Sequence, residues 1–369
     1  MTTGVHHENL AAFSSVPLDV AVRTRAGRRD PGRPLEQIGN RMSGTTWAWV
    51  RTAGAAATLA VVVWHLGAGP FLDGVRAVDG GALAAAAGIG VLTTVCCAWR
   101  WTIVARGLGV QLSLPVAVAA YYRSVFLNLT LPGGVVGDVH RGVSHGRDVR
   151  DVGGALRAVA WERAAGQLVQ AVLTVAVLLA LPSPVRSSMP LVAAALAVVV
   201  IGVVLVGRAQ PRGGRSRWAR LRNAATRDVR DALLTRKALP AIALTSALVV
   251  VGHAVTFMIA ARTAGTTAPV SRMLPLALLA MLAMVLPSVA GWGPREGATA
   301  WAFAAAGLGA EQGVATAVVY GVMVLVASLP GALVLVGAWL PRVRPPRRPE
   351  SQLPGRVPVV VQPDGGADA

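Results

Sequence analysis

The feature that most constrains this chain is a series of long apolar runs separated by short polar loops. Six runs reach the roughly 20 residues that a helix needs to cross a bilayer. They cover residues 47–70, 80–99, 160–181, 189–207, 239–261 and 313–340. Charged residues make up only 14% of the chain, against about 25% in a typical soluble domain. This pattern excludes a disordered protein, a disulfide scaffold and most soluble enzymes, and it predicts an all-α polytopic helical membrane protein.

Two further apolar runs are short and are broken by proline. Residues 113–131 end against Pro132. Residues 273–290 contain Pro287, and a small apolar run at 297–310 follows them. Because both proline-broken runs are marginal for crossing a bilayer, we expect each to enter and leave the membrane on the same side. With these two re-entrant segments, the sequence predicts about seven or eight membrane segments.

The distribution of basic residues predicts the orientation. The formal net charge is +18, and Lys237 is the only lysine. Residues 208–237 carry ten Arg or Lys against two acidic residues. Such clusters between apolar runs follow the positive-inside rule, so we expect this loop and both termini in the cytoplasm and the chain in the inner (plasma) membrane. The chain then divides into a disordered cytoplasmic tail at 1–45, a flippase-like transmembrane domain at 46–340 and a second disordered tail at 341–369. Nucleic acid is not an expected partner.

Cysteines and nucleotide motifs give no indication of a cofactor. Cys96 and Cys97 are adjacent within an apolar run, which argues against a framework disulfide or a zinc site. A Walker phosphate-binding motif does not occur in the sequence. We therefore expect no cofactor and no metal.

Two segments in different halves of the chain resemble each other. Leu131–Arg141 and Leu286–Glu296 each begin with Leu-Pro and continue through glycines to an arginine near an acid. Proline- and glycine-broken segments at matching positions indicate an inverted-repeat transporter site. A helix that begins after such a break directs free N–H groups at an anion, and Arg141 and Arg295 would add forked donors for phosphate. The candidate lipid- or phosphate-binding residues are Gly133, Gly137, Asp138, Arg141, Glu162, Arg163, Gly293, Arg295 and Glu296.

Each of these residues also has a structural interpretation. Arg141 could lie at the cytoplasmic interface, Asp138 could cap a helix, and Glu162-Arg163 could snorkel at the start of a span. Lone histidines in apolar runs are interpreted as packing residues, and several tryptophans as interface anchors. These residues are His65, His253, Trp99, Trp101, Trp161 and Trp339.

One stretch of the chain, from Tyr122 to Arg163, resembles the transmembrane region of lysylphosphatidylglycerol synthases. The residues that carry this resemblance are Asn128, Leu131-Pro132-Gly133, Gly137-Asp138, Arg141 and Trp161-Glu162-Arg163. A second signature of that family resembles two later stretches, Leu286-Pro287 through Arg295-Glu296 and Ser328-Leu329-Pro330-Gly331. The resemblance covers roughly residues 50–340 and implies a flippase-like domain with two re-entrant segments and a lipid cavity between its halves. In the synthases a separate soluble domain makes the aminoacylated lipid, and we expect no such domain after residue 341. The chain departs from the family pattern at Asp138, Trp292 and Pro294.

The sequence favours a membrane lipid translocase rather than an enzyme. Its expected substrate is an anionic or zwitterionic phospholipid, a glycolipid or a polyprenyl-phosphate carrier. The alternative is a non-catalytic scaffold subunit that partners an envelope-biosynthesis enzyme. A glycosyltransferase acting on a lipid-linked sugar is less favoured, because the acids near the membrane are scattered rather than clustered for metal-assisted transfer.

Overall fold

The structure is a computed structural model that describes residues 76–131, 134–209, 217–286 and 292–339, together with the isolated residues 64, 69 and 72. These residues belong to one compact unit and form helices without a β-strand. The predicted tails at 1–45 and 341–369 lie outside the described residues, as do Gly133, His65 and almost all of the first apolar run.

Long apolar helices dominate the described part of the chain. They are α3 (Gly80–Gly107), α6 (Val152–Ala180), α7 (Met189–Arg208), α9 (Ala238–Thr263) and α12 (Ala310–Ser328), which α13 (Pro330–Trp339) follows. Within the described ranges, five segments are long and apolar enough to cross a membrane, and in one of them α12 and α13 are joined. The connections contain a short 3-10 helix (η1, Arg186–Ser188), a short π-helix (η2, Val229–Leu233) and the basic helix α8 (Arg217–Asp228). The prediction of an all-α polytopic membrane protein is confirmed.

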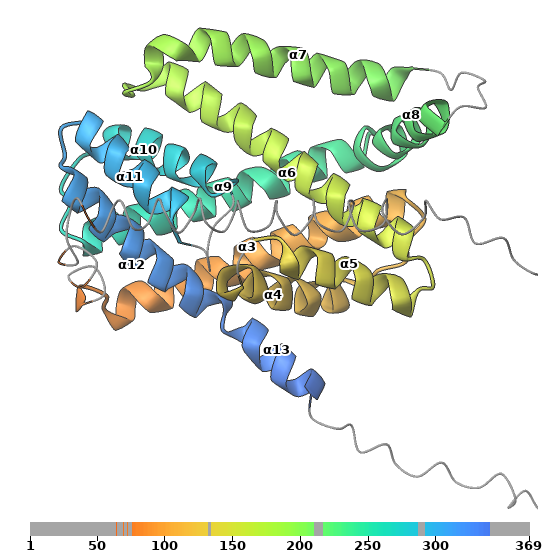
Figure 1. Cartoon of the computed structure of the whole chain (residues 1–369), viewed down its shortest axis with the longest axis horizontal. Helices are drawn as coiled ribbons and strands as arrows, with labels where there is room; N and C mark the ends of the chain where they lie inside the picture. The colour runs from red at the N-terminus through yellow and green to blue at the C-terminus, as the bar shows by residue number, and fades with distance from the viewer. Residues whose placement is uncertain are drawn as a thin grey trace, which may run out of the picture. The chain divides into compact units, whose positions relative to one another are not determined.

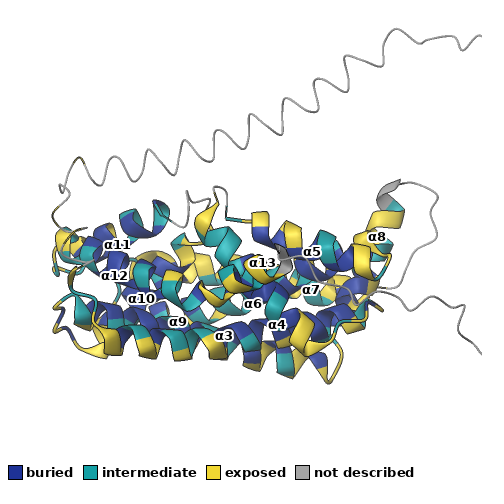
Figure 2. Ribbon diagram, turned by 90° about the horizontal axis from the view of Figure 1, so that it is seen from below, coloured by how far each residue is buried: buried dark blue, intermediate teal, exposed yellow. Residues whose placement is uncertain are grey.

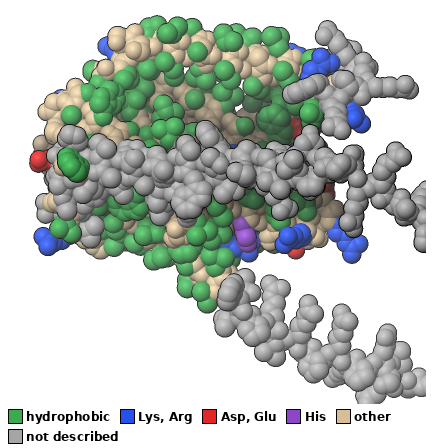
Figure 3. Space-filling view, viewed as in Figure 1, with side chains coloured by type: hydrophobic (Ala, Val, Ile, Leu, Met, Phe, Trp, Pro, Cys, Tyr) green, Lys and Arg blue, Asp and Glu red, His purple; other side chains and the backbone are tan. Residues whose placement is uncertain are grey.

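The molecular surface has the pattern expected of a membrane protein. The face seen in Figure 3 is mainly hydrophobic, with Lys and Arg near its two ends. Figure 2 shows that the exposed positions lie on the outer sides of the helices. Only Met189 and Gly207 are buried within α7, so that most of this apolar helix is available to lipid.

Several helix boundaries differ from the apolar runs that predicted them. Helix α3 continues to Gly107, beyond the expected end at residue 99. Helix α6 begins at Val152, eight residues before the expected start at 160. Glu162 and Arg163 therefore lie inside the helix rather than at its N-terminal end. The expected run 313–340 is divided at Leu329, where α12 ends and Pro330 begins α13. Buried pairing with Glu162 lets Arg100 continue α3 past residue 99, and the Asp151 side chain caps the earlier start of α6 by accepting from the Gly154 amide. A proline, which cannot donate a backbone hydrogen bond, divides the third helix.

The two proline-broken runs form helical hairpins. Helix α4 (Leu114–Thr130) precedes α5 (Val136–Asp148), and α10 (Val270–Ala283) precedes α11 (Pro294–Ala305). In the first hairpin Val149 packs in the same cluster as Val110 and Val118, so the chain leaves where it entered. In the second hairpin Arg272 Nη2 donates to the carbonyl oxygen of Ala306 at 2.6 Å. Both segments are therefore re-entrant in form, as expected.

The two halves pack as an inverted repeat. Helices α3 to α6 correspond to α9 to α12, because α3 packs on α4, α6 and α12 in the way that α9 packs on α10, α12 and α6. Val104, near the end of α3, clusters with Ile242 near the start of α9, whereas Ala86 clusters with Phe257. The two core helices are therefore antiparallel. Figure 1 shows the α4–α5 hairpin and the α10–α11 hairpin at opposite ends of these helices.

Candidate lipid-binding cavity

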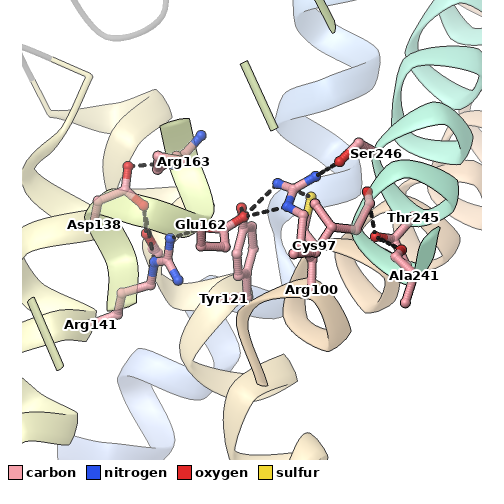
Figure 4. A network of polar contacts seen from close by, with 12 residues as sticks. Cys97, Arg100, Tyr121, Asp138, Arg141, Glu162, Arg163, Ala241, Thr245 and Ser246 are labelled. Atoms are coloured by element: carbon pink, nitrogen blue, oxygen red, sulfur yellow. Dashed lines mark hydrogen bonds and ion pairs between the residues drawn. The ribbon is translucent and has the colours of Figure 1, made fainter. Parts of the chain in front are cut away.

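A chain of buried ion pairs connects α3, α5 and α6 (Figure 4). Glu162 lies at its centre: Oε1 accepts from Arg100 Nε at 2.9 Å and Oε2 accepts from Arg141 Nη2 at 2.7 Å. Arg141 Nε in turn donates to Asp138 Oδ1 at 3.0 Å, and Asp138 Oδ2 pairs with Arg163 Nη2 at 2.7 Å. Three arginines thus share two carboxylates, which leaves the network with one positive charge.

The surroundings of Arg141 contradict its interpretation as an interfacial residue. Its side chain is completely buried, and its guanidinium lies 4.5 Å from the ring centres of both Trp101 and Tyr121. Two aromatic faces and Glu162 therefore compensate the loss of water around this charge. Trp101 is also completely buried, so its interpretation as an interface anchor is wrong.

Short polar contacts close the break between α4 and α5. The Gly137 amide donates to Asn128 Oδ1 at 2.7 Å, and Asn128 Nδ2 donates to Asp138 Oδ2 at 3.1 Å. A Cβ atom on Gly137 would lie 2.0 Å from the carbonyl oxygen of Ser124, so α5 can approach α4 this closely only with glycine there. Gly137 therefore allows α4 and α5 to pack closely against each other. Asp138 connects α5 to the ion-pair chain rather than acting only as a helix cap.

The second hairpin carries a smaller version of this arrangement. Arg295 Nε donates to Glu296 Oε1 at 2.9 Å, and Arg295 Nη2 contacts the same oxygen. Glu296 Oε2 accepts from the Gly293 amide at 2.7 Å, and Gly293 has φ of +115°, a conformation that favours glycine. Glu296 is the third residue of α11, and Asp138 is the third residue of α5. The two carboxylates therefore occupy matching positions in the repeat.

Aromatic rings and a glycine shape the space around Arg295. Its guanidinium lies 5.4 Å from the ring centres of Trp292 and Tyr320. A Cβ atom on Gly321 would lie 2.5 Å from Arg295 Nη2, so this glycine of α12 leaves room for the arginine. The Tyr320 hydroxyl lies 2.9 Å from His253 Nδ1, which agrees with the interpretation of His253 as a hydrogen-bonded packing residue.

A cavity of about 280 Å³ lies between the two halves. Gly134 and Leu286, next to the breaks of the two hairpins, both line it, so hairpins from opposite ends reach the same space. One side of the cavity is apolar, with residues such as Ile89, Val250 and Met281. Its polar lining consists of Thr93, Thr94, Arg100, Tyr121, Asn128, Arg163, Gln167, Gln170, Ser246, His253, Thr256, Arg295, Tyr320 and Ser328.

The arginines at the cavity differ from the predicted pair. Arg295 lines it as expected, but Arg141 does not, because its side chain is enclosed by the ion-pair chain. Arg163 and Arg100 contribute the cavity surface from the first half instead. Arg100 was not among the candidates, since its place after the run 80–99 suggested a cytoplasmic helix end. Glu162 and Glu296 are fully buried partners rather than cavity-lining residues.

The charged side chains that line the cavity, among the residues that the structure describes, are arginines. Among the residues that the structure describes, no three His, Cys, Asp or Glu side chains gather to hold a metal. The Arg163 side chain lines the cavity and is 38% exposed, and its buried Nε atom has no hydrogen-bond partner. A guanidinium with free donors in an enclosed space is suited to a phosphate oxygen.

Two inverted helical halves with re-entrant hairpins around a polar cavity define a multi-pass membrane protein. The family model described as the lysylphosphatidylglycerol synthase TM region matches residues 48–331, and the chain belongs to this family. This membership indicates a membrane lipid-related function. A search of curated proteins finds no match to the chain.

Proposed function

We propose that this protein moves a phosphate-bearing lipid between the two leaflets of its membrane without altering it chemically. The substrate would be a phospholipid, a glycolipid or a polyprenyl-phosphate carrier whose headgroup enters the central cavity while its chains stay in apolar surroundings. The observation that carries this proposal is the position of the cavity, which both hairpin breaks reach from opposite ends of the molecule.

The energetics of the headgroup support this use of the cavity. A charged group at bilayer depth is costly, by roughly 2.5–3.5 kcal/mol or more, unless polar partners receive it. Arg163 and Arg295 come from different halves and supply such partners within one cavity. In inverted-repeat transporters, the site stays near the middle while the halves rock around it. The same geometry here would present one headgroup site alternately to each leaflet.

Translocation can be measured with fluorescent lipids in proteoliposomes. Vesicles that contain the protein should lose the inner-leaflet signal to an external membrane-impermeant quencher much faster than protein-free vesicles. Heat-unfolded protein is the control for leakage, which an encapsulated soluble dye also reports. If correctly folded protein leaves the rate at the protein-free level for phospholipid and polyprenyl-phosphate probes alike, the translocase proposal is wrong and the scaffold alternative is favoured.

We also propose that the protein lies in the plasma membrane with both termini and the basic segment 208–237 in the cytoplasm. Cysteine labelling tests this orientation, because the native Cys96 and Cys97 are buried. Exposed Ser187, between α6 and α7, should react with an impermeant maleimide in intact cells once it is replaced by Cys. Exposed Arg236→Cys, before α9, should react only after the membrane is opened. The reverse pattern would overturn the orientation.

A further inference from the structure

The cavity lining has one sign of charge. Arg100, Arg163 and Arg295 contribute three positive charges, and no Asp or Glu is among the described residues that line it. Next to Arg163, helix α6 adds Gln167 and Gln170, which are one and two turns further along the same side of the helix. The lining therefore offers amide and guanidinium donors without a carboxylate.

The nearest carboxylates are already engaged. Glu162 and Glu296 are completely buried, and Asp138 is 8% exposed. Glu162 accepts from two arginines, and Glu296 accepts from Arg295 and the Gly293 amide. Asp138 bonds two arginines, and it also accepts from Asn128 Nδ2 at 3.1 Å. An ammonium group that entered the cavity would find arginines and no available counter-ion.

Among the cavity arginines, Arg163 has the fewest partners, and it belongs to the ion-pair chain where positive charge is in excess. Arg100 is largely engaged, because hydrogen bonds to Glu162, Ser246 and Cys97 use four of its five N–H groups. Arg163 has a single carboxylate partner, and its Nε atom is unpartnered. The ion-pair chain that holds Arg163 carries one more arginine than it has carboxylates. An incoming anion would neutralise the one excess positive charge of this ion-pair chain.

From this arrangement we infer that the cavity selects its lipid by the net charge of the headgroup. It takes a phosphate headgroup with net negative charge and rejects one whose added ammonium groups make it net positive, such as an aminoacylated phosphatidylglycerol. Like charges brought together in a site with little water are strongly unfavourable, whereas an anion gains several charge-assisted hydrogen bonds. This inference rests on the proposed function, since it specifies the substrate class of the same cavity.

Lipid binding to the purified full-length protein tests the inference. Phosphatidylglycerol, phosphatidylcholine and lysylphosphatidylglycerol with identical acyl chains would compete against a fluorescent phosphatidylglycerol. We expect phosphatidylglycerol to compete about tenfold or more better than the lysylated lipid, with phosphatidylcholine between them. Equal competition by all three, or a preference for the lysylated lipid, would overturn the inference. Soluble glycerol phosphate should compete poorly, and competition equal to that of the lipid would assign the cavity to a soluble anion instead.

A single isosteric change should shift the charge preference. Gln167→Glu places a carboxylate on the cavity wall, one turn from Arg163. It should weaken phosphatidylglycerol binding about tenfold and reduce the discrimination against the lysylated lipid. Gln111→Glu, at an exposed position outside the cavity lining, is the matched control and should leave the preference unchanged. Unchanged selectivity in a folded Gln167→Glu protein would contradict the inference.

The outcomes separate the inference from the proposed function. Charge-selective binding without translocation would leave the inference intact and contradict the translocase proposal. Translocation of all three lipids at the same rate, with equal binding, would keep the proposed function and overturn the inference.

Discussion

Glu162→Gln should lower the free energy of unfolding by about 3–5 kcal/mol, because it removes the shared partner of two buried arginines. Arg100 and Arg141 both bond this carboxylate, and their side chains are 6% and 0% exposed. The substitution keeps the size of the side chain but leaves both guanidinium groups without a full counter-charge. Thermal unfolding of the purified protein and its abundance in the membrane would both report the loss.

Arg163→Gln provides the matched comparison within the same ion-pair chain. The Arg163 side chain is 38% exposed, and its partner Asp138 keeps the bond to Arg141. We therefore expect a much smaller loss of stability from Arg163→Gln, together with a clear loss of lipid binding. If Glu162→Gln were as stable as the wild-type protein, the interpretation of the ion-pair chain as a structural element would be wrong.

Arg295→Ala should abolish translocation, since it removes the cavity-lining arginine of the second half. This substitution should also lower stability, because Glu296 would remain buried with only the Gly293 amide as its partner. Loss of translocation and loss of stability would therefore be difficult to distinguish in this variant. Arg295→Lys resolves this, because it retains the positive charge beside Glu296 but loses the forked geometry. We expect Arg295→Lys to lower the translocation rate about tenfold or more, with a melting temperature close to that of the wild-type protein.

Arg157→Lys is the control for this exchange. Arg157 lies on α6, its side chain is 53% exposed, and it is not part of the cavity lining. Its replacement should leave translocation unchanged. Wild-type translocation and lipid binding by Arg295→Ala would end the assignment of Arg295 to the lipid site and leave it a packing residue.

Much of the fold could be predicted because membrane insertion imposes simple rules on sequence. The runs 189–207 and 239–261 predicted α7 and α9 almost to the residue, since continuous apolar stretches must form helices in lipid. The hairpins were predicted for a related reason. A proline or glycine break in a short run leaves backbone groups that only protein or water can satisfy, so such a run folds back within the protein.

The arrangement of arginines could not be predicted in the same way. Arg141 and Arg163 both lie near Asp138 in the folded chain, and only the three-dimensional packing makes one a buried partner and the other a cavity residue. Arg100 was missed because an arginine after an apolar run is usually a sign of the cytoplasmic interface. Its partner Glu162 is 62 residues away, and no local pattern connects them.

The departures from the family pattern fit the local geometry. Asp138 directly follows Gly137 and bonds both Arg141 and Arg163. Trp292 lies against the Arg295 guanidinium, and Pro294 begins α11, where a missing N–H is tolerated. The second hairpin therefore accommodates these two larger residues.

The two hairpins are not held to the core helices with equal strength. This difference would make the proposed translocation open to one leaflet before the other. Ion pairs bind α5 to α6, and through Glu162 to α3, so this hairpin is locked to the core helices. Among the described residues, the one ion pair of the second hairpin, Arg295–Glu296, lies within α11, and no ion pair joins α10 or α11 to another helix. As far as the described residues show, movement of α10 and α11 would disrupt packing and aromatic contacts, whereas movement of α5 would also separate buried charges. We therefore expect the α10–α11 hairpin to be the easier gate, and the proposed translocation to begin with the leaflet that this hairpin faces.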